Sequence, residues 1–147
     1  MERTSPSGVY CGRIDWIDTD AAGIYHNSAV TRYVEAAEAE LMRSRGLHDY
    51  FGRAPRVRYE VDFEVPLRFG QQLTAVVELV QIGTSSMTFA FELWGEPFEG
   101  RPHCRAAKGR YVTVHIEGDH SGRDPARSAP WPARWVHALT EAEESPV

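Results

Sequence analysis

The sequence predicts an α+β domain in which a mainly antiparallel five-stranded sheet wraps around one long central helix. A single stretch has helical periodicity, and four segments after it alternate apolar and polar residues with a period of two. One further apolar segment precedes the helix, so the expected order of elements is β-α-β-β-β-β. At 147 residues, with 42% hydrophobic and 25% charged residues, the chain has the composition of one globular domain.

The long helix is predicted over residues 27–45, because no glycine or proline interrupts them and their apolar residues share one face. These apolar residues are Val30, Tyr33, Val34, Ala37 and Leu41. Either Asn27 or Ser28 is expected to accept a hydrogen bond from an unpaired N–H group of the first turn. Gly46 suits the left-handed conformation in which many helices end.

Five strands are expected, and residues 56–65 give the clearest pattern, with apolar and charged residues alternating as in a strand with one solvated face. The others are expected near residues 73–79, 87–93 and 103–116, and around Tyr10, Ile14 and Trp16 before the helix. An open sheet leaves two edges exposed. Pairing with a second copy would cover one edge, so a homo-oligomer, a dimer or tetramer, is expected.

The C-terminal part of the chain differs in composition. Residues 1–117 are predicted to form the domain, and residues 118–147 a tail that is not a separate domain. Four of the nine prolines lie in this tail, as is typical of an irregular surface segment. Pro132 is suited to open a short helix that would bury Trp135, Val136 and Leu139.

Charge and targeting signals exclude several classes of protein. The formal net charge of -5 does not suit binding to nucleic acid or to an anionic membrane. No apolar run is long enough to span a bilayer, so membrane insertion is not expected. The N-terminal segment MERTSPSG lacks the apolar core of a secretory signal, and there are two cysteines, Cys11 and Cys104. A reduced, cytoplasmic protein is therefore expected.

The common motifs for nucleophiles, metals and cofactors do not occur in the sequence. There is no G-x-S-x-G, H-E-x-x-H, C-x-x-C, Walker A or G-x-G-x-x-G motif. The six histidines show no spacing typical of metal ligands. The sequence therefore implies neither a metal nor a cofactor.

The segment DTDAAGIYHNSAV, residues 18–30, combines two aspartates with small residues and the start of the predicted helix. The first turn of a helix offers unpaired N–H donors and a partial positive charge, which can stabilise the oxyanion formed when an acyl carbonyl is attacked. A nearby carboxylate can activate water or attack the carbonyl itself. This chemistry requires an activated acyl group, and a thioester fits because its leaving thiolate needs little acid assistance. The alternative is that Asp18 and Asp20 are solvated turn residues.

Three groups of residues carry a resemblance to a known family. They are Asp18-Thr19-Asp20-Ala21-Ala22-Gly23-Ile24, then Tyr25-His26-Asn27, then Arg32-Tyr33 with Glu35-Ala36-Ala37-Glu38. With the order of elements over residues 8–116, they resemble the hotdog-fold acyl-CoA thioesterases of the 4-hydroxybenzoyl-CoA thioesterase type, including the Tol-Pal-associated branch. The resemblance implies a sheet wrapped around a central helix, subunits joined into one continuous sheet, active sites between subunits, and hydrolysis of acyl-CoA to the free acid and coenzyme A.

The same resemblance implies the roles of individual residues. The family's catalytic carboxylate falls on Asp20, as base or nucleophile, and its oxyanion N–H donor on Asn27, while Asp18 is expected to position the loop. The residues expected to contact substrate are Gly23, Tyr25, His26, Ser85, Ser86, Arg58 and Lys108. His26 is shifted by one position from the family's Tyr-His element, so it is expected to line the acyl pocket or hold Asp20. Arg58 and Lys108 suit the phosphates of coenzyme A.

Two alternatives remain open from the sequence. The acyl group could be attached to an acyl carrier protein, although the net negative charge of the chain disfavours an acidic carrier. The domain could also bind acyl-CoA without cleaving it. A carboxylate beside a helix start argues for hydrolysis, because a pure binding module gains little from it.

Overall fold

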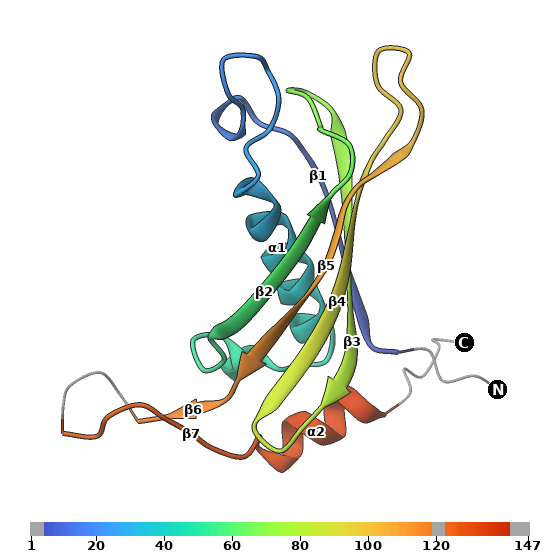
Figure 1. Cartoon of the computed structure of the whole chain (residues 1–147). Coiled ribbons are helices and arrows are strands. Elements are labelled where there is room, and N and C mark those ends of the chain that lie inside the picture. Colours follow the sequence, from blue (N-terminus) through green and yellow to red (C-terminus); the bar gives the residue numbers. More distant parts are fainter. Residues whose placement is uncertain (1–4, 119–122, 142–147) are drawn as a thin grey trace.

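The structure, a computed structural model, describes residues 5–118 and 123–141. Its elements are β1 (Ser7–Arg13), the 3-10 helix η1 (Trp16–Asp18), α1 (Ala29–Ser44), the 3-10 helix η2 (His48–Tyr50), β2 (Arg56–Phe63), β3 (Gln72–Ile82), β4 (Ser86–Gly95), β5 (Cys104–Val114), β6 (Ile116–Glu117), β7 (Arg127–Ser128) and α2 (Ala133–Thr140). Helix α1 lies along one face of an antiparallel sheet with strand order β1-β3-β4-β5-β2 (Figure 1). The predicted α+β class and five-stranded sheet are confirmed.

The hydrophobic core lies between α1 and one face of this sheet. The apolar face of α1 predicted from the sequence is buried, with Val30, Tyr33, Val34, Ala37 and Leu41 each at most 2% exposed. Alternate residues of β3 and β4 face it, namely Leu73, Ala75, Val77, Met87, Phe89, Phe91 and Leu93. Period-two burial on the strands and helical burial on α1 therefore form one continuous core.

Helix α1 packs mainly against β1 and β3, and a glycine permits the closest approach. A Cβ atom at Gly8 of β1 would lie 2.2 Å from the carbonyl oxygen of Ala37 and 2.8 Å from the backbone nitrogen of Leu41. Both distances are too short for any side chain. Gly8 thus fixes how near the helix lies to the first edge strand.

A buried polar cluster connects α1 to β2 and β5, at the other side of the sheet. Glu38 of α1, 6% exposed, accepts hydrogen bonds from the hydroxyl of Tyr111 and from Nη2 of Arg56, the latter at 3.1 Å. Arg56 also donates to Glu35, at 2.8 Å. Burial raises the pKa of Glu38, against the opposing effects of Arg56 and Tyr111. Directional polar contacts therefore orient β2 where the helix packs less closely.

Strand β2 exposes apolar residues that the rest of the described chain does not cover. Val57 is 61% exposed, Phe63 46%, and Val65, just after the strand, 38%. β2 is also an edge strand, paired on one side with β5. An uncovered apolar face on an unpaired edge is a surface suited to further association.

Two local expectations were wrong. Helix α1 begins at Ala29 instead of Asn27, and Ser28 makes no capping hydrogen bond, because it already has helical angles of φ -66° and ψ -21°. The carbonyl oxygens of His26 and Asn27 accept from Ala29 (2.9 Å) and Val30 (3.3 Å) instead. Trp16, expected in a strand, lies in η1 and is 70% exposed.

Helix α2 packs against the end of the sheet farthest from the start of α1 (Figure 1). Its residues Trp135 and Leu139 are 2% and 1% exposed, while Val136 is half-buried. The ring of Trp135 lies 5.6 Å from that of Tyr50 and 5.3 Å from that of His115.

Residues 119–122 and 142–147 of the predicted tail lie outside the described residues. No helix among those described is long and apolar enough to cross a membrane.

Replacing Trp135 with alanine is expected to lower the free energy of unfolding by about 3–5 kcal/mol, because it leaves a large cavity between α2 and Tyr50. Urea unfolding followed by circular dichroism measures the change. Trp16→Ala removes an exposed indole and is the control, with an expected loss below about 1 kcal/mol. Equal effects of the two substitutions would contradict a stabilising role for α2.

Candidate functional site

The loop before α1 forms a small hairpin centred on residues 21–23. Thr19 and Tyr25 face each other as bridge partners, and the Asp20 N–H donates to the carbonyl of Ile24 at 2.9 Å. Oδ1 of Asp20 accepts from the N–H groups of Ala22 (2.8 Å) and Ile24 (3.3 Å). Gly23 has a φ of +76°, which few other residues adopt. These contacts hold one carboxylate oxygen of Asp20, while Oδ2 has no hydrogen bond to any described residue.

Asp18 anchors the hairpin to the helix. Its buried carboxylate accepts from the Tyr33 hydroxyl at 2.8 Å, from the Arg32 guanidinium, and from the Asp15 N–H at 3.2 Å. Burial disfavours its charge, but the hydrogen bonds from Tyr33 and Arg32 outweigh burial and hold the pKa of Asp18 below its usual value. Its carbonyl oxygen also accepts the His26 N–H at 2.7 Å. One residue thus contacts the hairpin, the segment before α1 and the first turns of α1.

The start of α1 leaves backbone donors available. The N–H groups of Asn27 and Ser28 donate to no acceptor in the described part of the chain. Both residues are exposed, as is Asp20. Such N–H groups carry the partial positive charge of the helix start. An exposed carboxylate and free amides therefore lie on the two segments that Asp18 joins.

The structure groups only some of the residues predicted to contact substrate. Gly23, Tyr25 and His26 belong to the hairpin and the segment that follows it. Tyr25 is 4% exposed, its hydroxyl has no partner among the described residues, and burial raises its pKa to about 12. The His26 side chain is exposed.

The remaining predicted residues lie elsewhere in the same chain. Ser85 lies in the β3–β4 turn and Ser86 begins β4, where the Ser86 carbonyl accepts from Trp131 Nε1 at 3.0 Å, beside α2. This end of the sheet is opposite the loop of Asp20 (Figure 1). Arg58 and Lys108 are exposed on β2 and β5, and Arg58 pairs with Glu60. Ser85 and Ser86 therefore lie away from Asp20 within one chain, and neither Arg58 nor Lys108 has a hydrogen bond or ion pair to the Asp20 loop among the described residues.

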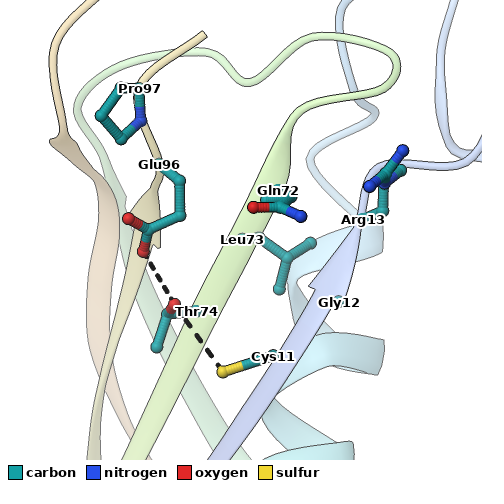
Figure 2. A pocket seen from close by; sticks show the side chains of 8 residues that line it. All are labelled: Cys11, Gly12, Arg13, Gln72, Leu73, Thr74, Glu96 and Pro97. Atoms are coloured by element: carbon teal, nitrogen blue, oxygen red, sulfur yellow. Dashed lines mark hydrogen bonds between the residues drawn. The ribbon is translucent and has the colours of Figure 1, made fainter.

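A groove of about 630 Å³ opens beside β1, β3 and the end of β4 (Figure 2). The Thr74 hydroxyl donates to Glu96 at 2.9 Å and lies 4.0 Å from Sγ of Cys11. The neighbour of this thiol is thus a hydroxyl group and not a base, so the groove lacks an activated nucleophile.

Among the described residues no group of three His, Cys, Asp or Glu side chains is arranged to hold a metal ion.

Sequence reasoning missed Arg68, which lies directly beside the hairpin. Arg68 and Ile24 are bridge partners, flanked by hydrogen bonds from Tyr25 N–H to the Leu67 carbonyl (2.9 Å) and from Phe69 N–H to the Gly23 carbonyl (3.0 Å). The sequence offered no signal for this contact, because an arginine two residues before a glycine is typical of any solvated turn.

Comparison with known proteins identifies a family for this chain. A family model described as the thioesterase superfamily matches residues 22–99, more than half of the 147 residues. The chain is 25% identical over 118 residues to a protein of Aquifex aeolicus (strain VF5) that has the provisional name of an esterase. That match covers 74% of this chain and 92% of the relative.

Solved structures show the same fold. The 4-hydroxybenzoyl-CoA thioesterase from Pseudomonas sp. strain CBS-3 is similar with a TM-score of 0.80 and 18% identity, over 91% of this chain and 99% of that one. A thioesterase from Thermus thermophilus, complexed with coenzyme A and zinc, is similar with a TM-score of 0.75 and 24% identity, over 92% of both chains.

The long helix and the curled antiparallel sheet define a hotdog fold. The chain belongs to the thioesterase superfamily, and its class of activity is thioester hydrolysis. The resemblance stated from the sequence is confirmed.

Replacing Asp18 with asparagine is expected to lower the free energy of unfolding by about 1–3 kcal/mol at neutral pH, because a buried acceptor of several hydrogen bonds loses its charge. The folded-state pKa is lowered from 3.8, so the stabilisation is complete above that pH and is lost as the pH falls below it. The difference between variant and wild type should therefore shrink below pH 3.8.

Urea unfolding over a pH series measures this difference, and the exposed Asp62→Asn is the matched control. A gap between Asp18→Asn and wild type that stays constant with pH would contradict the assignment.

Proposed function

We propose that the protein is an acyl-CoA thioesterase that hydrolyses its substrate to a free acid and coenzyme A. The observation that carries the proposal is the carboxylate of Asp20, with one free oxygen, on a hairpin joined through Asp18 to the free N–H groups at the start of α1. The names of similar proteins support coenzyme A as the leaving group. Similar structures include 1,4-dihydroxy-2-naphthoyl-CoA thioesterase from Synechocystis, with a TM-score of 0.72 and 21% identity, over 90% of this chain and 95% of that one.

In this proposal Asp20 acts as base or as nucleophile. As a base it takes a proton from water, whose oxygen bonds to the carbonyl carbon to give a tetrahedral intermediate; the C–S bond then breaks and the thiolate leaves. As a nucleophile its oxygen bonds to the carbonyl carbon, the C–S bond then breaks and the thiolate leaves, and water hydrolyses the resulting anhydride to the free acid and the Asp20 carboxylate. In both cases the Asn27 N–H stabilises the negative oxygen of the tetrahedral intermediate. A structurally similar thioesterase in which an aspartate is replaced by asparagine was crystallised with 4-hydroxybenzoyl-CoA, which supports an essential aspartate.

We further propose that two copies pair through β2. Its outer edge pairs with no described strand, and its apolar residues Val57 and Phe63 are exposed. Antiparallel pairing of identical strands reverses their direction, so the end of one copy that carries Ser85 and Ser86 would lie beside the Asp20 end of the other. The serines, with Arg58 and Lys108, would then contact substrate across the interface, while Gly23, Tyr25 and His26 contact it within one chain.

Asp20→Asn is expected to lower kcat by about a hundredfold or more, because base and nucleophile are both lost while the amide still accepts from the loop. Thiol release from a panel of acyl-CoA esters measures the rate. Asp124→Asn makes the same chemical change at an exposed residue near the C-terminal segment and should keep wild-type rates. Hydrolysis by Asp20→Asn at the rate of Asp124→Asn would refute the proposal.

The same panel tests the alternatives. Faster release from an acyl carrier protein than from coenzyme A, with the same acyl group, would favour a carrier-protein thioesterase. Tight binding of acyl-CoA without release of thiol would favour a binding module.

Val57→Lys is expected to weaken self-association about tenfold or more, because a charge on the β2 edge opposes strand pairing. Sedimentation velocity over a concentration series measures the dissociation constant. Val80→Lys, on β3 and 40% exposed, is the control. Unchanged association of Val57→Lys would argue against pairing through β2.

A further inference from the structure

Arg68 stands apart from the other cations of the chain. Within residues 5–118 and 123–141, six arginine and lysine side chains make neither an ion pair nor a hydrogen bond: Arg13, Arg53, Arg68, Arg101, Lys108 and Arg110. The other five are exposed, whereas Arg68 is half-buried and its Nε atom is buried without an acceptor. Burying part of a guanidinium without an anion beside it lowers the stability of the fold. The contacts within the described residues therefore do not explain why an arginine occupies position 68.

The side chain of Gln71 fixes the backbone at Arg68. Its N–H donates to Oε1 of Gln71 at 3.1 Å, and Nε2 of Gln71 donates to the Glu96 carbonyl at 3.0 Å. Gln71 is 2% exposed. The unpaired charge is therefore carried by a turn whose backbone is fixed by a buried side chain.

Arg68 is also in register with the proposed catalytic aspartate. Ile24 is the bridge partner of Arg68, and Ile24 exchanges hydrogen bonds with Asp20 across the hairpin. Asp20, Ile24 and Arg68 thus occupy opposite positions on three adjacent segments. Two interstrand spacings separate Asp20 from Arg68 by about 10 Å between backbones, within reach of substrate that contacts both.

We propose that Arg68 binds an anionic oxygen of the thioester substrate; this rests on the proposed function. The guanidinium forms paired hydrogen bonds with a carboxylate or a phosphate equally well. The anion is therefore either a carboxylate at the far end of the acyl group or a phosphate of coenzyme A. The short distance to Asp20 favours the acyl carboxylate, because the extended pantetheine arm carries the phosphates away from the thioester.

Binding to uncleaved substrates tests the proposal. Dissociation constants are measured by calorimetry for Asp20→Asn alone and combined with Arg68→Gln. The probes are hexanoyl-CoA, adipoyl-CoA, which adds a terminal carboxylate at the same carbon number, and hexanoyl-pantetheine, which lacks the phosphates of coenzyme A. Arg101→Gln in the same background is the control for loss of one positive charge, because Arg101 is exposed and makes no ion pair or side-chain hydrogen bond among the described residues. It lies in the β4–β5 connection, which is at the same end of the sheet as the loop before α1 (Figure 1).

For an acyl carboxylate, Arg68→Gln should weaken adipoyl-CoA about ten- to hundredfold and leave hexanoyl-CoA unchanged. For a phosphate, it should weaken both CoA esters equally and leave hexanoyl-pantetheine unchanged. Equal effects on all three probes, or effects no larger than those of Arg101→Gln, would overturn the proposal.

Stability separates ligand binding from a structural role. Arg68→Gln should unfold at the same urea concentration as wild type or a higher one, because it removes an uncompensated charge. A clear loss of stability would also overturn the proposal. Because these readouts do not require turnover, failure of wild-type protein to release thiol would refute the proposed function without deciding the role of Arg68.

Discussion

The buried carboxylate of Asp18 is the interaction on which the geometry of the candidate site depends. Its side chain joins η1 to Arg32 and Tyr33 of α1, and its carbonyl joins the hairpin to His26. A loop of small residues has little side-chain packing of its own to fix its conformation. A charged acceptor that satisfies several donors supplies the missing constraint, since each donor left unpaired in a buried place would be costly. The two aspartates of the motif thus have different environments, one buried and fully bonded, the other exposed with one oxygen free.

The packing of α1 explains why the β1 side of the sheet is closely covered while the β2 side keeps exposed apolar residues. Gly8 lets β1 approach the helix closely, and apolar side chains fill the space over β3. Toward β5 and β2 the separation is spanned by Glu38, Arg56 and Tyr111 instead. Ion pairs of this kind specify orientation more than they add stability. The outer part of β2 is left with exposed apolar residues, and a second copy of the chain would supply the contacts that α1 does not make there.

Much of the fold follows from local patterns in the sequence, and most of the site does not. Periodicity was sufficient for α1 and for β2–β5, because burial on one face repeats with the geometry of the element. It failed at Trp16, whose large apolar side chain lies exposed in a 3-10 turn, and at Ser28, where carbonyl groups serve as caps. Asp20 could be proposed as a site residue from the sequence because its motif is contiguous. Arg68 and the Glu38 cluster depend on contacts between distant segments, which leave no period in the sequence.

The absence of an activated serine or cysteine from the described part of the proposed site is consistent with thioester chemistry. A thiolate is a much better leaving group than an alkoxide or an amine, so hydrolysis of a thioester needs little general acid assistance. The main requirements are an attacking oxygen and stabilisation of the oxyanion. In the proposed site, the carboxylate held by backbone N–H groups and the helix start with free amides would meet both requirements. Burial raises the pKa of Tyr25, so its hydroxyl stays protonated. This buried side chain of the same segment is therefore uncharged and does not act as a second base. The proposed chemistry thus requires little beyond one carboxylate and backbone N–H groups, and selectivity between substrates would depend on the side chains around them, such as Arg68.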